Sequence, residues 1–514
     1  MAVKADTHAV LKAARLRALP PETPRAIVSL QEGLRGFVSV PGMADYAEAS
    51  AGNPLYPSQP AAIVFCATES DVALSLACAQ ENDLPIRARS GRHSVCGFSG
   101  TNGGLTIDVS LMNQVAVDYP ARTATVGSGA NFGQLNAALD IYMLHVPGGT
   151  CDDVGIAGHM QGGGYGFTTR EYGVNCDRVR QVRVMLADGR IIRANRELNS
   201  QLHWAVRGGT GGNFGVLLDV TYDLADLYDV WGFVLQWPID QGPQVMVALQ
   251  EGFMRRGSAP DELGFYPVLA TIDSAQVLVV LGMYHGPRET GVQVIAPLQA
   301  IGKPTMTMDT VDTYANLNDG LLNVLAGPGP TGTFEAKRSG YIVSPLGEDG
   351  WRAVCEYYKT TPNPYNIAFM EPYGGQVSRI PADDCAFVHR AVDLNLFVDS
   401  FWNPNWPNCH TPDVAWAWVN GFIETFEAYR DGSVYQNYPE MALEDYRQAY
   451  WGANFPQLLA VKQRADPEGV FTYPQAVTPY PAGSPAAAAA PTAHLPELEP
   501  EPYSRTQLTS APIS

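Results

Sequence analysis

Residues 147–166 read PGGTCDDVGIAGHMQGGGYG, and this stretch decides the fold because it holds too many glycines for an ordinary helix or strand. Each glycine costs backbone entropy and contributes no side-chain contacts. We therefore expect a loop whose backbone is approached closely by a flat group. Cys151 lies inside this loop. Its thiol is either a small buried hydrophobic group or a nucleophile activated by its surroundings.

A second unusual loop lies upstream, where residues 87–94 read RARSGRHS. The loop follows a predicted strand, and a tight turn there frees backbone N–H groups. Together with the arginines, these groups form an anion cradle suited to a pyrophosphate. His93 alone is weak evidence of chemistry, because a single loop histidine is more often a hydrogen-bonded structural residue.

The hydrophobic pattern around these loops predicts one α+β unit over residues 55–225. It opens as a βαβ unit, with strands at 62–66 and 85–89 on either side of a helix at 70–81. The Asp188-Gly189 pair between two further runs is a hairpin turn signal. The other expected elements are strands at 105–108, 123–126, 179–187 and 190–194 and a helix at 130–139.

A second lobe is expected over residues 226–444, and a helical N-terminal segment over residues 1–54. Runs such as 231–237 and 277–285 alternate like strands of an antiparallel sheet with one buried face, and helical stretches lie between them. Beyond residue 478 the composition shifts to proline, alanine and glutamate, which bury too little apolar surface to become ordered. We therefore expect residues 479–514 to form a flexible tail.

Composition and charge argue against several classes of partner. The 33 basic and 52 acidic residues give a formal charge of −19, which repels phosphate backbones and anionic lipid headgroups, so neither nucleic acid nor a membrane is an expected partner. No apolar run has the length of a transmembrane span or a signal peptide, and the eight cysteines form no CxxC pair. These features predict a soluble cytoplasmic protein, the alternative being a secreted enzyme with one disulfide. The cysteines and histidines also lack the spacing of a metal site.

Taken together, the two loops resemble those of the berberine bridge enzyme-like branch of the vanillyl-alcohol oxidase superfamily. The resemblance implies an α+β fold with a two-part PCMH-type FAD-binding domain, plus a substrate domain whose antiparallel sheet is covered by helices. In that family the histidine of an R-S-G-x-H loop bonds the flavin 8α-methyl group, and the cysteine of a G-G-x-C loop bonds carbon 6. The matching residues are His93 and Cys151, so the resemblance implies FAD attached covalently at two points.

Two further stretches carry the resemblance. Residues 204–215 read WAVRGGTGGNFG and are similar to a family signature in which Thr210 replaces a glycine. Residues 445–478 are similar to the closing segment, which returns to the FAD domain and places Asn454 near the isoalloxazine ring. The resemblance implies further flavin contacts from Arg89, Ser90, Gly91, Arg92, Ser94, Val154, Gly155, Gly158, Gly163, Gly164 and Tyr165.

The chemistry that the resemblance implies needs a base to take the substrate proton as hydride leaves for the flavin. Sugar-oxidising relatives use the tyrosine of an N-Y-P motif, which is Tyr438 here, and we expect Tyr373 to assist it. The alternative is that both tyrosines only pack. Berberine-type cyclases use a glutamate of the substrate lobe instead, and the resemblance assigns no glutamate of this chain to that role.

Val154 fits a position where the family places a small side chain when oxygen must reach the reduced flavin. This favours an oxidase that takes hydride from an alcohol, hemiacetal or similar C–H donor, such as an oligosaccharide or natural product, and passes electrons to O2 to give H2O2. Two alternatives stay open: an oxidative cyclase or desaturase of natural-product biosynthesis, and a flavin-loaded protein that binds a drug-like molecule without turnover. The oligomeric state is also left open.

Overall fold

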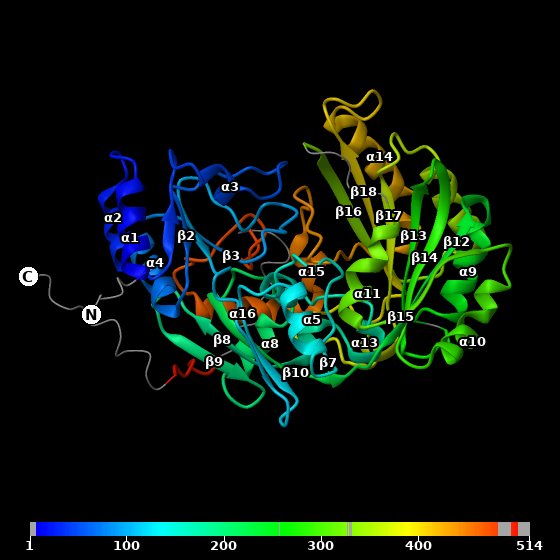
Figure 1. The fold of residues 1–514 in the computed structure, drawn as a ribbon, viewed down its shortest axis with the longest axis horizontal. Coiled ribbons are helices and arrows are strands. Elements are labelled where there is room, and N and C mark those ends of the chain that lie inside the picture. The colour runs from blue at the N-terminus through cyan, green and yellow to red at the C-terminus, as the bar shows by residue number, and fades with distance from the viewer. Residues whose placement is uncertain (1–6, 256, 326, 328–331, 482–494, 502–514) are drawn as a thin grey trace, which may run out of the picture.

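Two lobes lie side by side in the computed structural model, which describes residues 7–255, 257–325, 327, 332–481 and 495–501 (Figure 1). The first lobe holds three sheets, of four, five and two strands, built from the N-terminal half of the chain. The second holds one large sheet with helices on its outer face (Figure 1). Among the described residues, no helix is long and apolar enough to cross a membrane.

A four-stranded sheet opens the first lobe, in the order β1-β2-β4-β3. Its strands are β1 (Phe37–Ser39), β2 (Ala62–Phe65), β4 (Leu105–Asp108) and β3 (Ile86–Arg89). The last three run parallel, as the predicted βαβ unit requires. The crossover helix α4 (Glu69–Glu81) begins at Thr68, whose side chain forms a capping box with Asp71. Because β3 ends at Arg89, the loop that follows lies at the carboxyl edge of the parallel strands.

The N-terminal segment belongs to this sheet and is not purely helical. Strand β1 pairs with β2 in the antiparallel sense, which the sequence pattern did not predict because the strand is only three residues long. Around it lie α1 (Thr7–Ala18), α2 (Arg25–Gly33) and α3 (Tyr46–Ser50). Helix α2 packs against α4 and covers one side of the sheet.

The second sheet of the first lobe is antiparallel, in the order β5-β6-β10-β8-β9. Its strands are β5 (Val115–Asp118), β6 (Thr123–Gly127), β10 (Val216–Asp223), β8 (Val179–Met185) and β9 (Ile191–Asn195). The β8–β9 hairpin turns at Asp188-Gly189, as predicted. The other elements of this lobe are α5 (Phe132–Asp140), β7 (Leu144–His145), α6 (Ile156–Gln161), α7 (Thr169–Tyr172), η1 (Asn175–Arg178), α8 (Ser200–Val206) and β11 (Ala225–Asp226).

The second lobe is built on a seven-stranded antiparallel sheet, in the order β15-β12-β14-β13-β17-β18-β16. Its strands are β15 (Thr305–Asp312), β12 (Val230–Pro238), β14 (Ala275–Tyr284), β13 (Leu263–Ile272), β17 (Ile367–Pro372), β18 (Leu394–Trp402) and β16 (Phe334–Ile342). The helices are α9 (Gly242–Gly252), α10 (Arg288–Gln299), α11 (Tyr314–Gly320), α12 (Gly347–Tyr358), α13 (Gly375–Arg379) and α14 (Pro412–Glu424), with short turns η2 (Ile239–Gln241), η3 (Leu321–Val324) and η4 (Glu427–Tyr429).

Apart from the largely exposed edge strand β15, the large sheet is buried on both faces, whereas the sequence pattern predicted one buried face. Along β18, Leu396 and Val398 pack into the core beneath the outer helices, while Phe397 belongs to the core shared with the first lobe. Alternate residues of each strand therefore serve two different cores. The inner face, toward the first lobe, is the one that matters for the site.

The C-terminal segment returns to the first lobe, where its orange helices lie among blue and cyan elements (Figure 1). It comprises α15 (Tyr446–Trp451), η5 (Gly452–Asn454) and α16 (Phe455–Ala465). Helix α16 packs on α8, and the Lys462 ammonium donates hydrogen bonds to the backbone oxygens of Asn213, at 2.7 Å, and Phe471, at 2.6 Å. Residues before 445 already contact the first lobe, because the Gln436 side chain donates to Gly208 O at 3.0 Å and the Asn437 side chain donates to His159 O at 2.9 Å.

Part of the predicted flexible tail is docked. Residues 495–501 lie against the first lobe, with the Glu501 N–H donating to Ile191 O at 2.9 Å. The Glu501 carboxylate accepts from Arg183 at 2.9 Å and from Arg193 at 3.0 Å, and Leu495 and Leu498 pack on the apolar core. A few side chains are enough to anchor this proline-rich segment, whatever its average composition. Residues 482–494 and 502–514 lie outside the described part of the chain.

Candidate functional site

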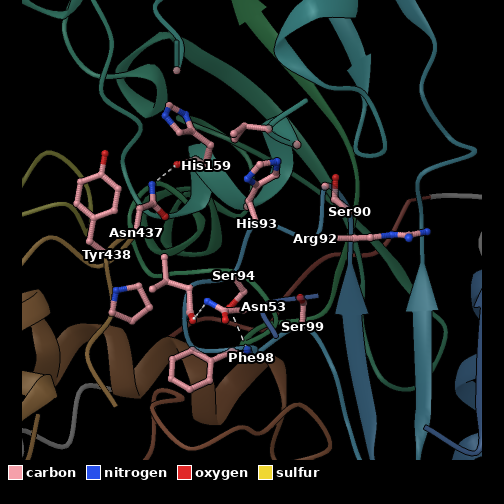
Figure 2. Close-up of a pocket in the computed structure, with 18 of the residues that line it drawn as sticks. Asn53, Ser90, Arg92, His93, Ser94, Phe98, Ser99, His159, Asn437 and Tyr438 are labelled. Atoms are coloured by element: carbon pink, nitrogen blue, oxygen red, sulfur yellow. Dashed lines mark hydrogen bonds between the residues drawn. The ribbon is translucent and has the colours of Figure 1, made fainter. Parts of the chain in front are cut away.

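A cavity of about 850 Å³ lies where the two lobes meet. Its wall combines the loops at 87–94 and 147–166, the C-terminal segment and the inner face of the large sheet. Figure 2 shows His93 between the Ser90–Arg92 stretch and the Asn437–Tyr438 pair, which come from opposite ends of the chain. The fold thus gathers into one space the residues that the sequence analysis singled out separately.

The two loops touch backbone to backbone, and this contact requires glycine on both sides. A Cβ atom on Gly91 would lie 2.2 Å from the Gly155 nitrogen, and one on Gly155 would lie 2.5 Å from the Gly91 nitrogen. Because neither contact is sterically possible, any side chain here would push the loops apart. The contact places His93 and Cys151 on adjoining loops of the same cavity.

Cys151 differs from every other cysteine of the chain. It is exposed, toward the cavity, while the remaining seven are buried. Partial desolvation raises the pKa of its thiol, and the nearby carboxylates of Asp153 and Asp319 raise it further. Of the two readings that the sequence leaves open, the structure rules out a buried hydrophobic residue.

Arginine and glycine residues of the cavity fit an acceptor-rich, anionic dinucleotide such as FAD. Arg89 is held by Asp108 at 2.7 Å, yet its Nη2 is buried without a partner among the described residues, as is Arg87 Nε. Two unused donors beside one cavity indicate a missing acceptor. Gly158 has no atom within 4 Å of the position that its Cβ would take, so the backbone there faces open space for a flat ligand.

Tyr438 lies on the cavity wall and donates a hydrogen bond of 2.7 Å to Glu371 Oε1. The other carboxylate oxygen of Glu371 accepts from Asn395 at 2.8 Å. Burial, only partly offset by these bonds and by Lys337, raises the pKa of Glu371 to about 7. Burial and the Glu371 carboxylate raise the pKa of Tyr438 well above its usual value.

Glu371 is not among the residues that the sequence predicts for the site, although it lies in β17 directly before Pro372 and Tyr373. The alternation of strand residues could have identified it, because Ile367, Phe369 and Glu371 share one face and all line the cavity. The tyrosine of this stretch attracted attention instead, since tyrosine is the base that the resemblance implies.

Carboxylates and aromatic rings alternate across the inner face of the sheet. Lys337 on β16 is paired with Asp399 at 2.6 Å and with Glu335 at 3.2 Å, so its positive charge is already matched. Its ammonium lies 4.3 Å from the centre of the Phe397 ring and 5.1 Å from that of Tyr438. This wall therefore offers acceptor oxygens and ring faces rather than a free cation.

Four of the predicted site residues do not line the cavity. Tyr373 is fully buried behind it, where its hydroxyl lies 3.1 Å from that of Tyr341. Asn454 donates to the backbone oxygens of Ala382 and Cys385, so it ties the C-terminal segment to a loop. Both side chains point into the protein and not into the cavity, so their expected roles rest on the resemblance alone.

Gly163 and Gly164 are the other two, and they shape a turn. Their φ angles are +110° and +90°, and a Cβ atom on Gly163 would lie 2.5 Å from the Phe387 ring. The turn aims the Gly164 and Tyr165 N–H groups at the Tyr435 hydroxyl. Asn437 donates to His159 O at 2.9 Å, as Figure 2 shows, so the segment that carries Tyr438 is anchored to the glycine-rich loop.

All other predicted residues line the cavity. They are His93, Cys151, Arg89, Ser90, Gly91, Arg92, Ser94, Val154, Gly155, Gly158, Tyr165 and Tyr438.

Comparisons with known proteins agree with this arrangement. Residues 60–195 match the family described as "FAD binding domain", and residues 434–478 match "Berberine and berberine like". The FAD-linked oxidoreductase YvdP of Bacillus subtilis is 32% identical over 461 residues, which cover 87% of this chain and 98% of that protein. The xylooligosaccharide oxidase of Thermothelomyces thermophilus is 28% identical over 458 residues, 84% of this chain and 90% of the relative.

A solved structure shares the whole architecture. Wild-type BBE-like 1 of Physcomitrella patens superimposes with a TM-score of 0.78 at 25% identity, over 87% of this chain and 98% of its own. The predicted α+β class, with a two-part FAD-binding domain and a substrate domain, is confirmed. The chain is accordingly an FAD-binding protein, and it belongs to the berberine bridge enzyme-like family of FAD-linked oxidoreductases.

Proposed function

We propose that this oxidoreductase holds FAD by two covalent bonds, from His93 to the 8α carbon and from Cys151 to carbon 6. The observation that carries the proposal is that both side chains line one cavity, on loops whose glycines touch. Both are accessible there, since the His93 side chain is 44% exposed and Cys151 is the exposed cysteine. A doubly attached flavin cannot dissociate, so the cavity can stay open to a bulky substrate.

We assign the base to Tyr438, acting with Glu371. A substrate hydroxyl next to Tyr438 passes its proton to the phenol oxygen, and the phenol proton moves along the 2.7 Å hydrogen bond to Glu371. Tyr438 is not ionised beforehand, because its pKa is raised. Glu371, whose pKa is about 7, is matched to accept the proton near neutral pH. Bound in this cavity, FAD would supply the hydride acceptor and the path of the electrons to O2, with H2O2 as the product.

The wall of the cavity supports a substrate rich in hydroxyl groups. Glu335, Glu371 and Asp399 supply acceptor oxygens, and the aromatic side chains of Phe369, Phe397 and Phe401 lie on the same face of the sheet. Carboxylates that accept from hydroxyls beside rings that cover C–H surfaces are suited to an oligosaccharide. The relative named xylooligosaccharide oxidase supports the same substrate class.

Val154 lines the cavity three residues after Cys151. Its short side chain leaves room for oxygen, which supports oxidase rather than dehydrogenase turnover.

Glu371 also supports a second candidate, oxidative cyclisation or desaturation of a natural product. A buried carboxylate in the substrate lobe is the kind of base that the resemblance assigns to cyclases, and its raised pKa suits that role equally. The test is a screen of neutral oligosaccharides and of polycyclic phenols and amines, with peroxide release and product mass as readouts. Peroxide with an acid or lactone product supports the oligosaccharide oxidase. Ring closure of a phenolic amine, with no sugar turnover, supports the second candidate.

A further inference from the structure

One carboxylate bridges the two loops that carry the proposed anchors. Asp153 Oδ1 lies 3.2 Å from His93 Nε2, although the two residues belong to different loops. The Gly91–Gly155 backbone contact holds the loops at this separation. Asp153 is two residues from Cys151, so the same carboxylate also acts on that thiol and raises its pKa. A single side chain therefore bears on both attachment points.

The contact uses one particular nitrogen of the imidazole. With Nε2 facing Asp153, Nδ1 is left for bond formation. Alkylation of Nδ1 leaves positive charge on the ring, and a carboxylate at ion-pair distance stabilises that charge. Both side chains remain accessible, at 44% and 78% exposed, so a flavin can reach the histidine without displacing Asp153.

We propose that Asp153 is a positioning residue for the self-catalysed attachment of FAD to His93; this rests on the covalent attachment proposed above. A bond forms between His93 Nδ1 and the flavin 8α carbon, and a C–H bond of that carbon breaks. The C–H proton goes to solvent, and the Nε2 proton of the resulting imidazolium goes to Asp153 and then to solvent. The electron pair of the C–H bond stays on the ring system and is passed, with two protons, to O2, giving H2O2.

The two anchors respond in opposite ways to loss of this carboxylate. Asp153→Asn removes the charge that stabilises alkylated His93, so the His93 bond should form about tenfold more slowly or worse. The same change removes a charge that raises the pKa of Cys151, so the Cys151 bond should form at least as fast. Damage to the loop itself would slow both bonds.

The experiment separates the bonds by background. In Cys151→Ala only the His93 bond can form, and in His93→Ala only the Cys151 bond. Each background is combined with Asp153→Asn, Asp153→Glu and, as matched control, Asp152→Asn. Asp152 is the neighbouring exposed carboxylate, whereas the ion pair with His93 is made by Asp153. Each purified protein is incubated with FAD in air, and the fraction of chains that retain the mass of FAD after acid denaturation is followed over time.

In the Cys151→Ala background, we expect Asp153→Asn to slow formation of the His93 bond, Asp153→Glu to restore it and Asp152→Asn to have no effect. In the His93→Ala background, the Cys151 bond should form at an undiminished rate with all three changes. Unchanged His93 attachment with Asp153→Asn would overturn the inference, as would equal loss of both bonds. Failure of the covalent attachment itself is seen earlier and separately, as absence of flavin retained after acid denaturation in the Cys151→Ala parent.

Discussion

The Tyr438 hydroxyl and the Glu371 carboxylate are joined by a 2.7 Å hydrogen bond that spans the C-terminal segment and strand β17 of the substrate lobe. The two residues are 67 positions apart in sequence. The pair connects a phenol that can touch substrate with a buried acid whose pKa is raised to about 7. Proton removal is thereby divided between Tyr438, which contacts the substrate, and Glu371, which accepts the proton from Tyr438. Each residue can be substituted alone.

Tyr438→Phe should lower the rate of flavin reduction by about 10²-fold or more, because the phenol oxygen is the first proton acceptor. The covalently bound flavin should be unchanged. Rapid mixing of the oxidised enzyme with substrate under anaerobic conditions measures this rate directly.

The matched control is Tyr373→Phe, which removes a hydroxyl bonded to Tyr341 outside the cavity. It should reduce flavin at nearly the wild-type rate. A similar loss in both variants would show that tyrosine packing, rather than proton transfer, limits the reaction.

Glu371→Gln should remove a pH dependence. In the wild type, kcat/KM should rise as the pH passes upward through about 7, because only ionised Glu371 can take the proton from Tyr438. The glutamine variant should be slower and should lack this limb. The measurement is kcat/KM from pH 5 to 9; a variant that keeps the same limb would assign the ionisation to another group.

The same shift has a defined sign for stability. Glu371 has a folded-state pKa of about 7, above its ordinary 4.5, so the folded state holds the proton more tightly. Its contribution to stability is full below pH 4.5 and is lost as the pH rises through about 7. In Glu371→Gln, the free energy of unfolding should therefore decrease less between pH 5 and pH 8 than it does in the wild type. Denaturant unfolding at each pH measures this decrease.

Sequence patterns identified the loops and motifs of this site but not where every side chain points. Glycine-rich loops and the His93 and Cys151 positions can be read locally, because a loop that contacts a flat ligand needs glycine wherever the backbone approaches it. Asn454 and Tyr373 could not be placed this way, since the direction of a side chain at a helix start or strand end depends on packing with distant segments. Glu371 differs, because the alternation of residues along β17 places it on the same face as Ile367 and Phe369.

The inner face of the large sheet should make the enzyme prefer neutral substrates to acidic ones. Lys337 is already paired with Asp399 and Glu335, so the wall carries excess negative charge. A neutral oligosaccharide should have a higher kcat/KM than its uronic acid counterpart. Glu335→Gln should reduce that ratio, by about tenfold if the charge contacts substrate closely.

The control for this prediction is Glu348→Gln, which changes an exposed carboxylate paired with Arg352 on α12, away from the cavity. Its selectivity should equal that of the wild type. Preference for the acidic sugar in the unmodified enzyme would contradict the assignment of this wall to substrate.

Docking of residues 495–501 should stabilise the first lobe only slightly. Glu501 pairs with Arg183 and Arg193, and such partly exposed pairs each contribute about 0–1 kcal/mol. Glu501→Gln should lower the free energy of unfolding by that amount and leave kcat unchanged. Urea denaturation measures the loss; a large drop in activity would give the segment a role at the site.

The strands of this fold are easier to predict from sequence than the cores that their two faces contact. Hydrophobic runs located β2, β12 and β14 well, but a continuous run such as β18 cannot say which face meets which core. Strand β1 is too short, at three residues, to show a periodic pattern. The docking of residues 495–501 depends on the contact of Glu501 with Arg183 and Arg193, which lie 318 and 308 positions earlier in the sequence.

The most direct test of the account is the intact mass and absorbance of acid-denatured wild type, His93→Ala, Cys151→Ala and the double variant. Two independent covalent anchors predict that the wild type and both single variants retain the yellow colour and the mass of one FAD, and that the double variant loses both. A wild-type chain of unmodified mass, or complete loss of flavin from either single variant, would contradict it.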